Sequence, residues 1–224
     1  EPLDEAIARE PALLGDRCLA TFGPDLPFLM KVLSARHALS LQAHPSREQA
    51  EEGYEREEAG GVRVTSPLRT YKDDWPKPEI MVALDEFHTL AGFRDPADSY
   101  SLFERLGVLE VTHDIIAPLV ARPGVAGLQE VFLDVLSLDG ERRDVVDQVL
   151  AAAVSHRDDD GSLGDFARTA LELDEAFPGD PGILAALLMN RVVLAPGEAL
   201  FVPAGLLHSH LRGTGIEVMA NSDN

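Results

Sequence analysis

Two pairs of side chains that can bind a metal stand on short strand-like segments far apart in the chain. Gln42 and His44 lie in the first segment, and His208 and His210 lie in the second. Residues two apart on a strand point to the same face, so each pair presents its side chains together. Neutral imidazole is the commonest protein metal ligand, and an amide oxygen is a weaker, harder one. The two segments therefore predict a single metal site, for which the alternative is ordinary core or rim histidines.

A carboxylate is the expected further ligand, and the sequence offers two. Pro78 favours an extended conformation for Lys77, so Lys77 and Glu79 face the same side. On this motif alone, an ion pair in a surface turn is the favoured alternative. Glu48 follows His44 by four residues and competes with Glu79 for the same coordination position.

The glycine-rich stretch after His210 has the pattern of a hairpin turn between two strands. If Leu211 pairs with Ile216, His210 lies opposite Glu217, and Glu217 stands beside the metal face. Asp223 shares the parity of Glu217 if the strand extends that far. A glycine-rich turn specifies register poorly, so a slipped pairing is the alternative.

Hydrophobic periodicity predicts a fold that is mainly β with a helical insertion. Ser46 and Gln49 have the spacing of a helix capping box. A short amphipathic helix is expected at residues 3–14, and strands at 28–44, 80–84, 87–93, 191–194 and 199–202. We therefore expect residues 1–97 to begin a β domain, 98–190 to form the helical insertion, and 191–224 to return to the β domain.

Composition limits the class of protein. The chain has 224 residues and 45% apolar residues, enough for one large domain or one domain with an insertion. A net charge of −20 argues against a nucleic-acid partner, and no apolar run approaches the roughly 20 residues that span a membrane. The single Cys18 fits a reducing compartment, so we expect the cytoplasm. The chain has only three lysines, against sixteen arginines, and all three lie in the segment from Lys31 to Lys77. A local basic pocket and a chance cluster explain this equally well.

Further motifs stand at intervals along the whole chain. The stretch from Gly197 to His210 contains glycine, proline, glycine and histidine in the order of the second metal motif of cupin β-barrels, which it resembles. The other motifs are Leu26 to Leu33, Leu39 to Pro45, Tyr71 to Asp74, Lys77 to Glu79, Ala91 to Arg94, Pro178 to Gly182, Pro196 to Ala199 and Glu217 to Asn224. In this order they resemble the type I phosphomannose isomerase family of zinc enzymes.

The resemblance implies a cupin-type (jelly-roll) barrel with a helical domain inserted between strands. It implies one Zn²⁺ per chain and favours Glu79 over Glu48 as the carboxylate ligand. The implied ligand set is Gln42, His44, Glu79 and His208.

The implied reaction is the reversible isomerisation of mannose 6-phosphate and fructose 6-phosphate, through an enediol. Lys77 matches an active-site position beside the metal, where its charge can stabilise an oxyanion. Ser40 and Lys31 match substrate-contacting positions. The candidates for the general base are Glu217, His210 and Asp223, in that order. The implied partner is a small sugar phosphate, with neither nucleic acid nor membrane, and the chain is expected to be a monomer.

The sequence departs from the family pattern at two positions: His210 stands where the family usually has tyrosine, and Pro76 replaces a histidine before Lys77. The resemblance covers the N-terminal and central part of the family sequence, so the active-site arginine and the second cupin-like domain are expected to be absent from these 224 residues. Two alternatives follow: another metal-cupin enzyme, such as an oxygenase or epimerase, or a degenerate or truncated cupin that binds sugar phosphate without turnover.

Overall fold

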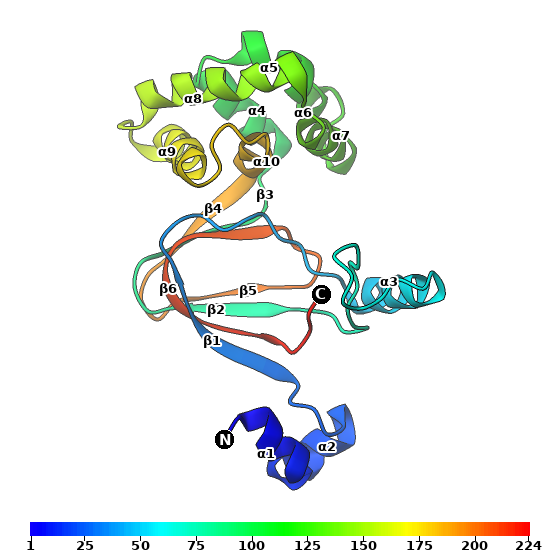
Figure 1. Cartoon of the computed structure of the whole chain (residues 1–224). Helices are drawn as coiled ribbons and strands as arrows, with labels where there is room; N and C mark the ends of the chain where they lie inside the picture. Colours follow the sequence, from blue (N-terminus) through cyan, green and yellow to red (C-terminus); the bar gives the residue numbers. More distant parts are fainter.

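A curled antiparallel sheet of six strands forms the middle of the molecule in the computed structural model, which describes the backbone of residues 1–224 and every side chain except that of Glu141 (Figure 1). The strands are β1 (Phe28–Ala35), β2 (Glu79–Ala83), β3 (Phe87–Phe93), β4 (Met189–Leu194), β5 (Ala199–Val202) and β6 (His208–Ala220). Their order is β4-β3-β6-β2-β5, and β1 pairs with β6. The chain is therefore a mixed α/β protein with a half-barrel sheet.

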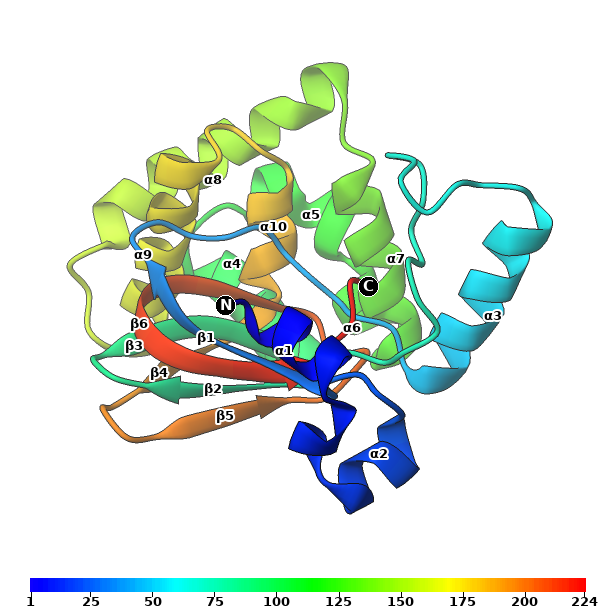
Figure 2. The same ribbon diagram turned by 60° about the horizontal axis from the view of Figure 1, so that its bottom comes forward.

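Strand β6 connects the two parts of this sheet. Its first half pairs with β3, and its second half pairs with both β1 and β2. Figure 2 shows β6 passing through the sheet as one long curved strand. The hairpin predicted after His210 is therefore wrong, because residues 211–216 continue the strand.

Two glycines in β6 serve close packing. A Cβ on Gly213 would lie 2.8 Å from the Glu86 carbonyl oxygen, and the residue has a φ of 120°. A Cβ on Gly215 would lie 2.8 Å from the carbonyl oxygen of Val82 on β2. Only glycine lets the curled strand approach its neighbours so closely.

A register shift in β6 changes which side chains face the interior. His88 pairs with Arg212, but the next residue, Thr89, pairs with His210, so Leu211 is an extra residue in β6. An extra residue of this kind is a β-bulge, and it moves the alternation of side chains by one. His208 and His210 face the interior before the bulge, and Glu217 faces it afterwards.

A layer of helices lies on one side of the sheet, between β3 and β4 in the chain (Figure 1). The helices are α4 (Pro96–Arg105), α5 (Leu109–Ile116), α6 (Pro118–Ala121), α7 (Val125–Leu136), the 3₁₀ turn η2 (Gly140–Arg143), α8 (Asp144–His156), α9 (Gly161–Ala176) and α10 (Gly182–Leu187). The helical periodicity expected in this region is confirmed. Its core is apolar: the rings of Phe103 and Phe166 pack edge to face at 5.1 Å, and Leu211 of β6 joins the same cluster.

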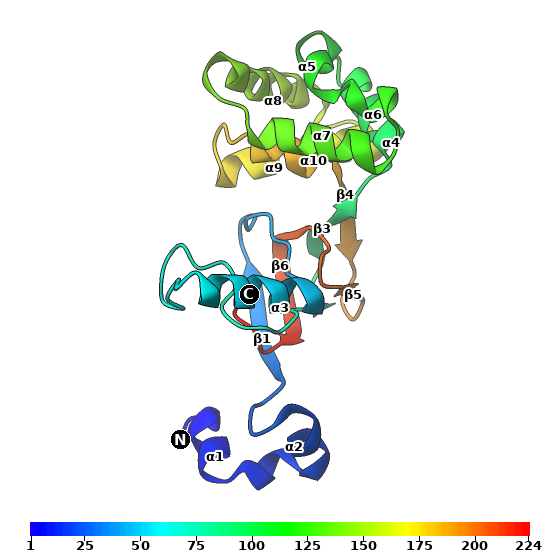
Figure 3. The same cartoon turned by 90° about the vertical axis from the view of Figure 1, so that its right-hand side faces the viewer.

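The remaining helices lie around the other sides of the sheet. The predicted helix at residues 3–14 is divided into α1 (Leu3–Arg9) and the 3₁₀ turn η1 (Pro11–Leu14), followed by α2 (Asp16–Phe22). Figure 3 shows α1 and α2 at the end of the molecule opposite the layer α4–α10. Within the part of the chain that the structure describes, no helix is long and apolar enough to cross a membrane.

Helix α3 (Arg47–Ala59) has the predicted capping box. The Gln49 backbone N–H donates to Ser46 Oγ at 3.2 Å, and the Ser46 N–H donates to Gln49 Oε1 at 2.9 Å. These bonds satisfy two N–H groups that a helix start otherwise leaves unpaired. The helix therefore begins three residues after His44 and fixes where that segment leaves the sheet.

Candidate metal centre

A buried carboxylate stands between two imidazoles inside the curled sheet. Glu79 Oε1 lies 3.2 Å from His44 Nε2, and Glu79 Oε2 lies 3.2 Å from His208 Nε2. The three side chains are 6%, 12% and 1% exposed, respectively. They come from β2, from the irregular segment before α3 and from β6, and one ligand atom of each lies within 4.8 Å of the others. This cluster has the composition and spacing of a metal site.

Backbone pairing places Gln42 beside the same cluster. The Gln42 N–H donates to the His208 carbonyl and the His208 N–H donates to the Gln42 carbonyl, both at 2.9 Å. Residues directly opposite one another in an antiparallel pair present their side chains on one face. The side chains of Gln42 and His208 therefore lie on one face of this pair.

The tautomers of the two imidazoles fit a metal. His208 Nδ1 lies 3.0 Å from the Leu206 carbonyl oxygen, and His44 Nδ1 lies 2.9 Å from the Asn224 carbonyl oxygen. A carbonyl only accepts, so Nδ1 carries the proton in each ring and the Nε2 lone pair of the neutral ring faces Glu79. His44 Nε2 is buried without a hydrogen bond. A cation at this point would bind all three facing groups.

The electrostatics of the metal-free cluster agree with this interpretation. Burial by itself raises the pKa of the Glu79 carboxyl, but the contacts with His208 and His44 lower it well below its usual range. Burial lowers the pKa of His208, while the Glu79 carboxylate raises it above its ordinary value. The carboxylate therefore stays ionised and draws positive charge, which a proton or a metal ion can supply.

A second cluster lies beside the first, around Glu217. Glu217 Oε1 lies 3.4 Å from His210 Nε2, and Glu217 Oε2 lies 2.8 Å from Lys31 Nζ across the pairing of β6 with β1. Burial raises the pKa of Glu217, but His210 and Lys31 lower it below its usual range. One ligand atom each of Glu79, His210 and Glu217 also lies within 4.8 Å of the others. The Lys31 ammonium already neutralises Glu217, so this cluster is better suited to proton transfer than to a second cation.

The other predicted site residues lie outside these clusters, in loops or at exposed positions. Lys77 is half-buried in the loop that leads into β2, two residues before Glu79. Ser40 is exposed and lines an apolar cavity of about 250 Å³ between the segment 39–41 and the helical layer. Strand β6 ends at Ala220, so the parity argument does not extend to Asp223, whose side chain is exposed. Glu48 is exposed in the first turn of α3.

Several residues that contact the site residues have no signal of this role in the sequence. Thr89 Oγ1 lies 3.1 Å from His210 Nδ1, behind the ring. The Asn224 carbonyl accepts a hydrogen bond from His44, and the Asp73 carboxylate accepts one from the Asn224 side chain. Both residues lie in loops. His88 lies outside the site and is buried with Arg191 Nη2 2.9 Å from its Nδ1. These contacts arise from tertiary packing, which local spacing does not encode.

The fold and the cluster together define a mixed α/β protein with a buried histidine–carboxylate cluster of the kind that binds a metal. Comparison with known proteins makes the assignment more specific. Residues 2–96 match the family described as phosphomannose isomerase type I, catalytic domain. The chain is 37% identical over 223 residues to mannose-6-phosphate isomerase of Salmonella typhimurium, covering 99% of this chain and 55% of that protein. It is 37% identical over 212 residues to the Escherichia coli protein of the same name, covering 95% of this chain and 52% of that protein.

Solved structures give the same result. A lysine-to-alanine mutant of phosphomannose isomerase from Salmonella typhimurium superposes with a TM-score of 0.89 and 36% identity, over 100% of this chain and 55% of that one. A zinc-bound mannose 6-phosphate isomerase superposes with a TM-score of 0.86 and 35% identity, with the same coverage. The chain belongs to the type I phosphomannose isomerase family, and it spans about half the length of the relatives it matches.

Proposed function

We propose that this chain carries the zinc centre of an aldose–ketose isomerase that interconverts mannose 6-phosphate and fructose 6-phosphate. One zinc ion per chain would be held by Gln42, His44, Glu79 and His208. The observation that carries this proposal is the Glu79 carboxylate, with each oxygen 3.2 Å from a buried imidazole. Nitrogen and oxygen ligands of this kind suit zinc. A neighbouring structure that is described as zinc-bound adds support.

The second cluster supports a role in proton transfer. Zinc, when bound, supplies Lewis-acid polarisation of the sugar oxygens. Glu217 is the proposed base for the carbon-bound proton, because Lys31 and His210 keep its carboxyl ionised. His210 and Asp223 follow as further catalytic candidates. Lys77 is proposed to stabilise negative charge on the substrate oxygen, and Ser40 and Lys31 to contact the substrate.

The finer architecture is also a proposal. The half-barrel sheet supports a cupin-type jelly roll formed by residues 1–97 and 191–224, with residues 98–190 as a helical domain inserted between β3 and β4. We propose that the protein acts as a monomer in the cytoplasm on a small sugar phosphate.

A coupled assay with mannose 6-phosphate and added zinc tests the function. We expect turnover that chelation abolishes and that is lost in His208→Ala. The matched control is His113→Ala, which removes an exposed histidine of α5 and should leave turnover unchanged. Zinc binding without turnover would favour a binding protein, and preference for iron with oxygen consumption would favour another metal-dependent cupin enzyme.

A further inference from the structure

We propose that Asp73 and Asn224 form a clamp that positions His44 for metal binding. The proposal rests on the zinc site proposed above and adds two positioning residues that do not touch the metal. The clamp is defined as the side chains of Asp73 and Asn224 together with the Asn224 carbonyl group. Its point of action is the hydrogen bond of 2.9 Å from His44 Nδ1 to that carbonyl oxygen.

The side chain of Asn224 is bonded at both ends to the loop before β2. Its Oδ1 accepts from the backbone N–H of Lys72 at 2.7 Å. Its Nδ2 donates to the Asp73 carbonyl at 2.8 Å and to the Trp75 carbonyl at 2.9 Å. An amide with this many partners has one orientation, so the backbone of the same residue is also fixed.

Asp73 completes the clamp from the opposite side. Its Oδ1 accepts from Ser222 Oγ at 2.8 Å and from Asn224 Nδ2 at 3.2 Å, while its Oδ2 accepts from the Asp223 N–H at 2.8 Å. One carboxylate therefore binds three consecutive residues of the segment that presents the carbonyl. Bonds to an ionised acceptor are stronger than neutral ones.

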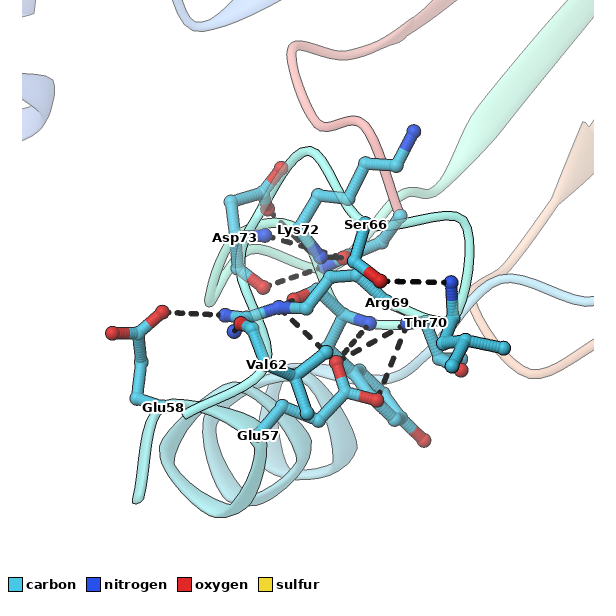
Figure 4. A network of polar contacts seen from close by, with 11 residues as sticks. Glu57, Glu58, Val62, Ser66, Arg69, Thr70, Lys72 and Asp73 are labelled. Atoms are coloured by element: carbon cyan, nitrogen blue, oxygen red, sulfur yellow. Dashed lines mark hydrogen bonds and ion pairs between the residues drawn. The ribbon is translucent and has the colours of Figure 1, made fainter. Parts of the chain in front are cut away.

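The loop that carries Asp73 is anchored to helix α3 by a buried arginine (Figure 4). The side chain of Arg69 is fully buried, and its Nε lies 3.1 Å from Glu57 Oε2. Glu57 also accepts from the Tyr71 N–H at 2.9 Å. The loop thus has a defined position relative to α3, whose start fixes His44. The two partners of the His44–Asn224 hydrogen bond are held by one connected network.

The consequence for His44 is a fixed tautomer and ring orientation. With its proton held on Nδ1 by the carbonyl, the neutral ring must present the Nε2 lone pair to Glu79 and to a metal. Without the clamp, the carbonyl can move, and the ring can rotate or take the other tautomer. Metal affinity would then fall although every ligand is still present.

Zinc affinity of Asp73→Ala and Asn224→Ala, measured by chelator competition, tests the clamp. We expect each dissociation constant to rise by about 10- to 100-fold. Because the two residues act as one unit, the double variant should bind zinc no more weakly than the weaker-binding single variant. Asp74→Ala is the matched control: it removes a neighbouring carboxylate that is 49% exposed and lies 3.5 Å from Arg47, and it should bind zinc normally.

A spectroscopic measurement separates positioning from general destabilisation. In the zinc-depleted protein at alkaline pH, where the imidazole is neutral, ¹⁵N shifts of His44 should report the Nδ1–H tautomer, and Asn224→Ala should give a mixture. Unchanged zinc affinity and an unchanged tautomer in both single variants would overturn the clamp. Absence of zinc binding by the unmodified protein would instead overturn the proposed function, while the tautomer measurement still tests the clamp.

Discussion

The helical layer and the curled sheet bury opposite kinds of side chain. The described core of helices α4–α10 is hydrocarbon, and its buried polar groups are the hydroxyls of Ser99, Thr112 and Thr169. Thr112 and Thr169 donate to helix carbonyls four residues earlier. The sheet and its loops instead bury ionisable groups, namely Arg69, Glu79, His88, His208, His210 and Glu217.

This difference separates stability from chemistry. Burial of apolar surface is the main stabilising term in folding, whereas burial of charge costs free energy unless the charge is paired. The helical layer therefore stabilises the chain, and the sheet holds polar groups ready for a cation or a proton. A substitution in the helical layer should therefore leave zinc binding by the sheet unchanged, and loss of a metal ligand should leave the apolar packing of the helices unchanged.

The largest expected effect is in the helical layer. Phe166→Ala removes a ring that is buried against Phe103, and such truncations cost about 3–5 kcal/mol of unfolding free energy. Urea unfolding of the zinc-depleted protein measures this loss. The zinc affinity of the folded fraction should stay within error of the unmodified protein, and a parallel loss of affinity would contradict the separation.

Zinc should stabilise the chain through the sheet. At about a thousandfold excess of free zinc over its dissociation constant, the gain in unfolding free energy is about 4 kcal/mol. The gain should vanish in His44→Ala, which removes one of the proposed ligands, and persist in Phe166→Ala. Thermal unfolding with and without zinc measures it; a gain that survives His44→Ala would place the zinc elsewhere.

A smaller effect is expected from the ion pair that holds Glu217. Lys31→Ala removes a cation 2.8 Å from this carboxylate, but the Lys31 side chain is 44% exposed and solvent screens the pair. We expect kcat/KM to fall about tenfold, equal to about 1.4 kcal/mol. The pKa of Glu217 should rise, so activity should be lost at a higher pH as the solution is acidified. Lys72→Ala, at an exposed position, is the control.

The smallest effect is expected at the start of α3. Ser46→Ala removes the capping box and should cost about 1 kcal/mol of unfolding free energy. Ser155→Ala, at an exposed position within α8, should be close to neutral. Comparing the two variants by urea unfolding shows whether the stability loss comes from the missing cap or from replacing any serine by alanine. Equal effects at both positions would remove the cap as the cause.

Local patterns in the sequence predicted the elements better than they predicted their long-range arrangement. Ser46 and Gln49 identified the start of α3, because a capping box needs only four consecutive residues. Gln42, His44 and His208 meet as their spacing suggested. The residue types suggested one shared metal site for the segments around residues 42 and 208, but their backbone pairing has no local signal over such a distance.

The proximity of His210 and Glu217 was predicted for the wrong reason. The glycine-rich stretch between them has the composition of a hairpin turn, yet its glycines permit close packing of Gly213 on Phe87 and of Gly215 on β2. A glycine required by a neighbouring strand cannot be distinguished from a turn glycine in a single sequence. The same limit applies to Asn224 and Asp73, whose partners lie about 150 residues away.

The extra residue in β6 has a consequence for insertions and deletions. His208 and Glu217 stand nine residues apart, so in a regular strand they would point to opposite faces, and Leu211 makes them convergent. Deleting Leu211 would keep every functional side chain in the sequence but turn one of the two clusters out of the interior. A chain that differs in length at this point can therefore keep all the same functional residue types and still lose the site, whereas apolar replacements of Leu211 should be tolerated.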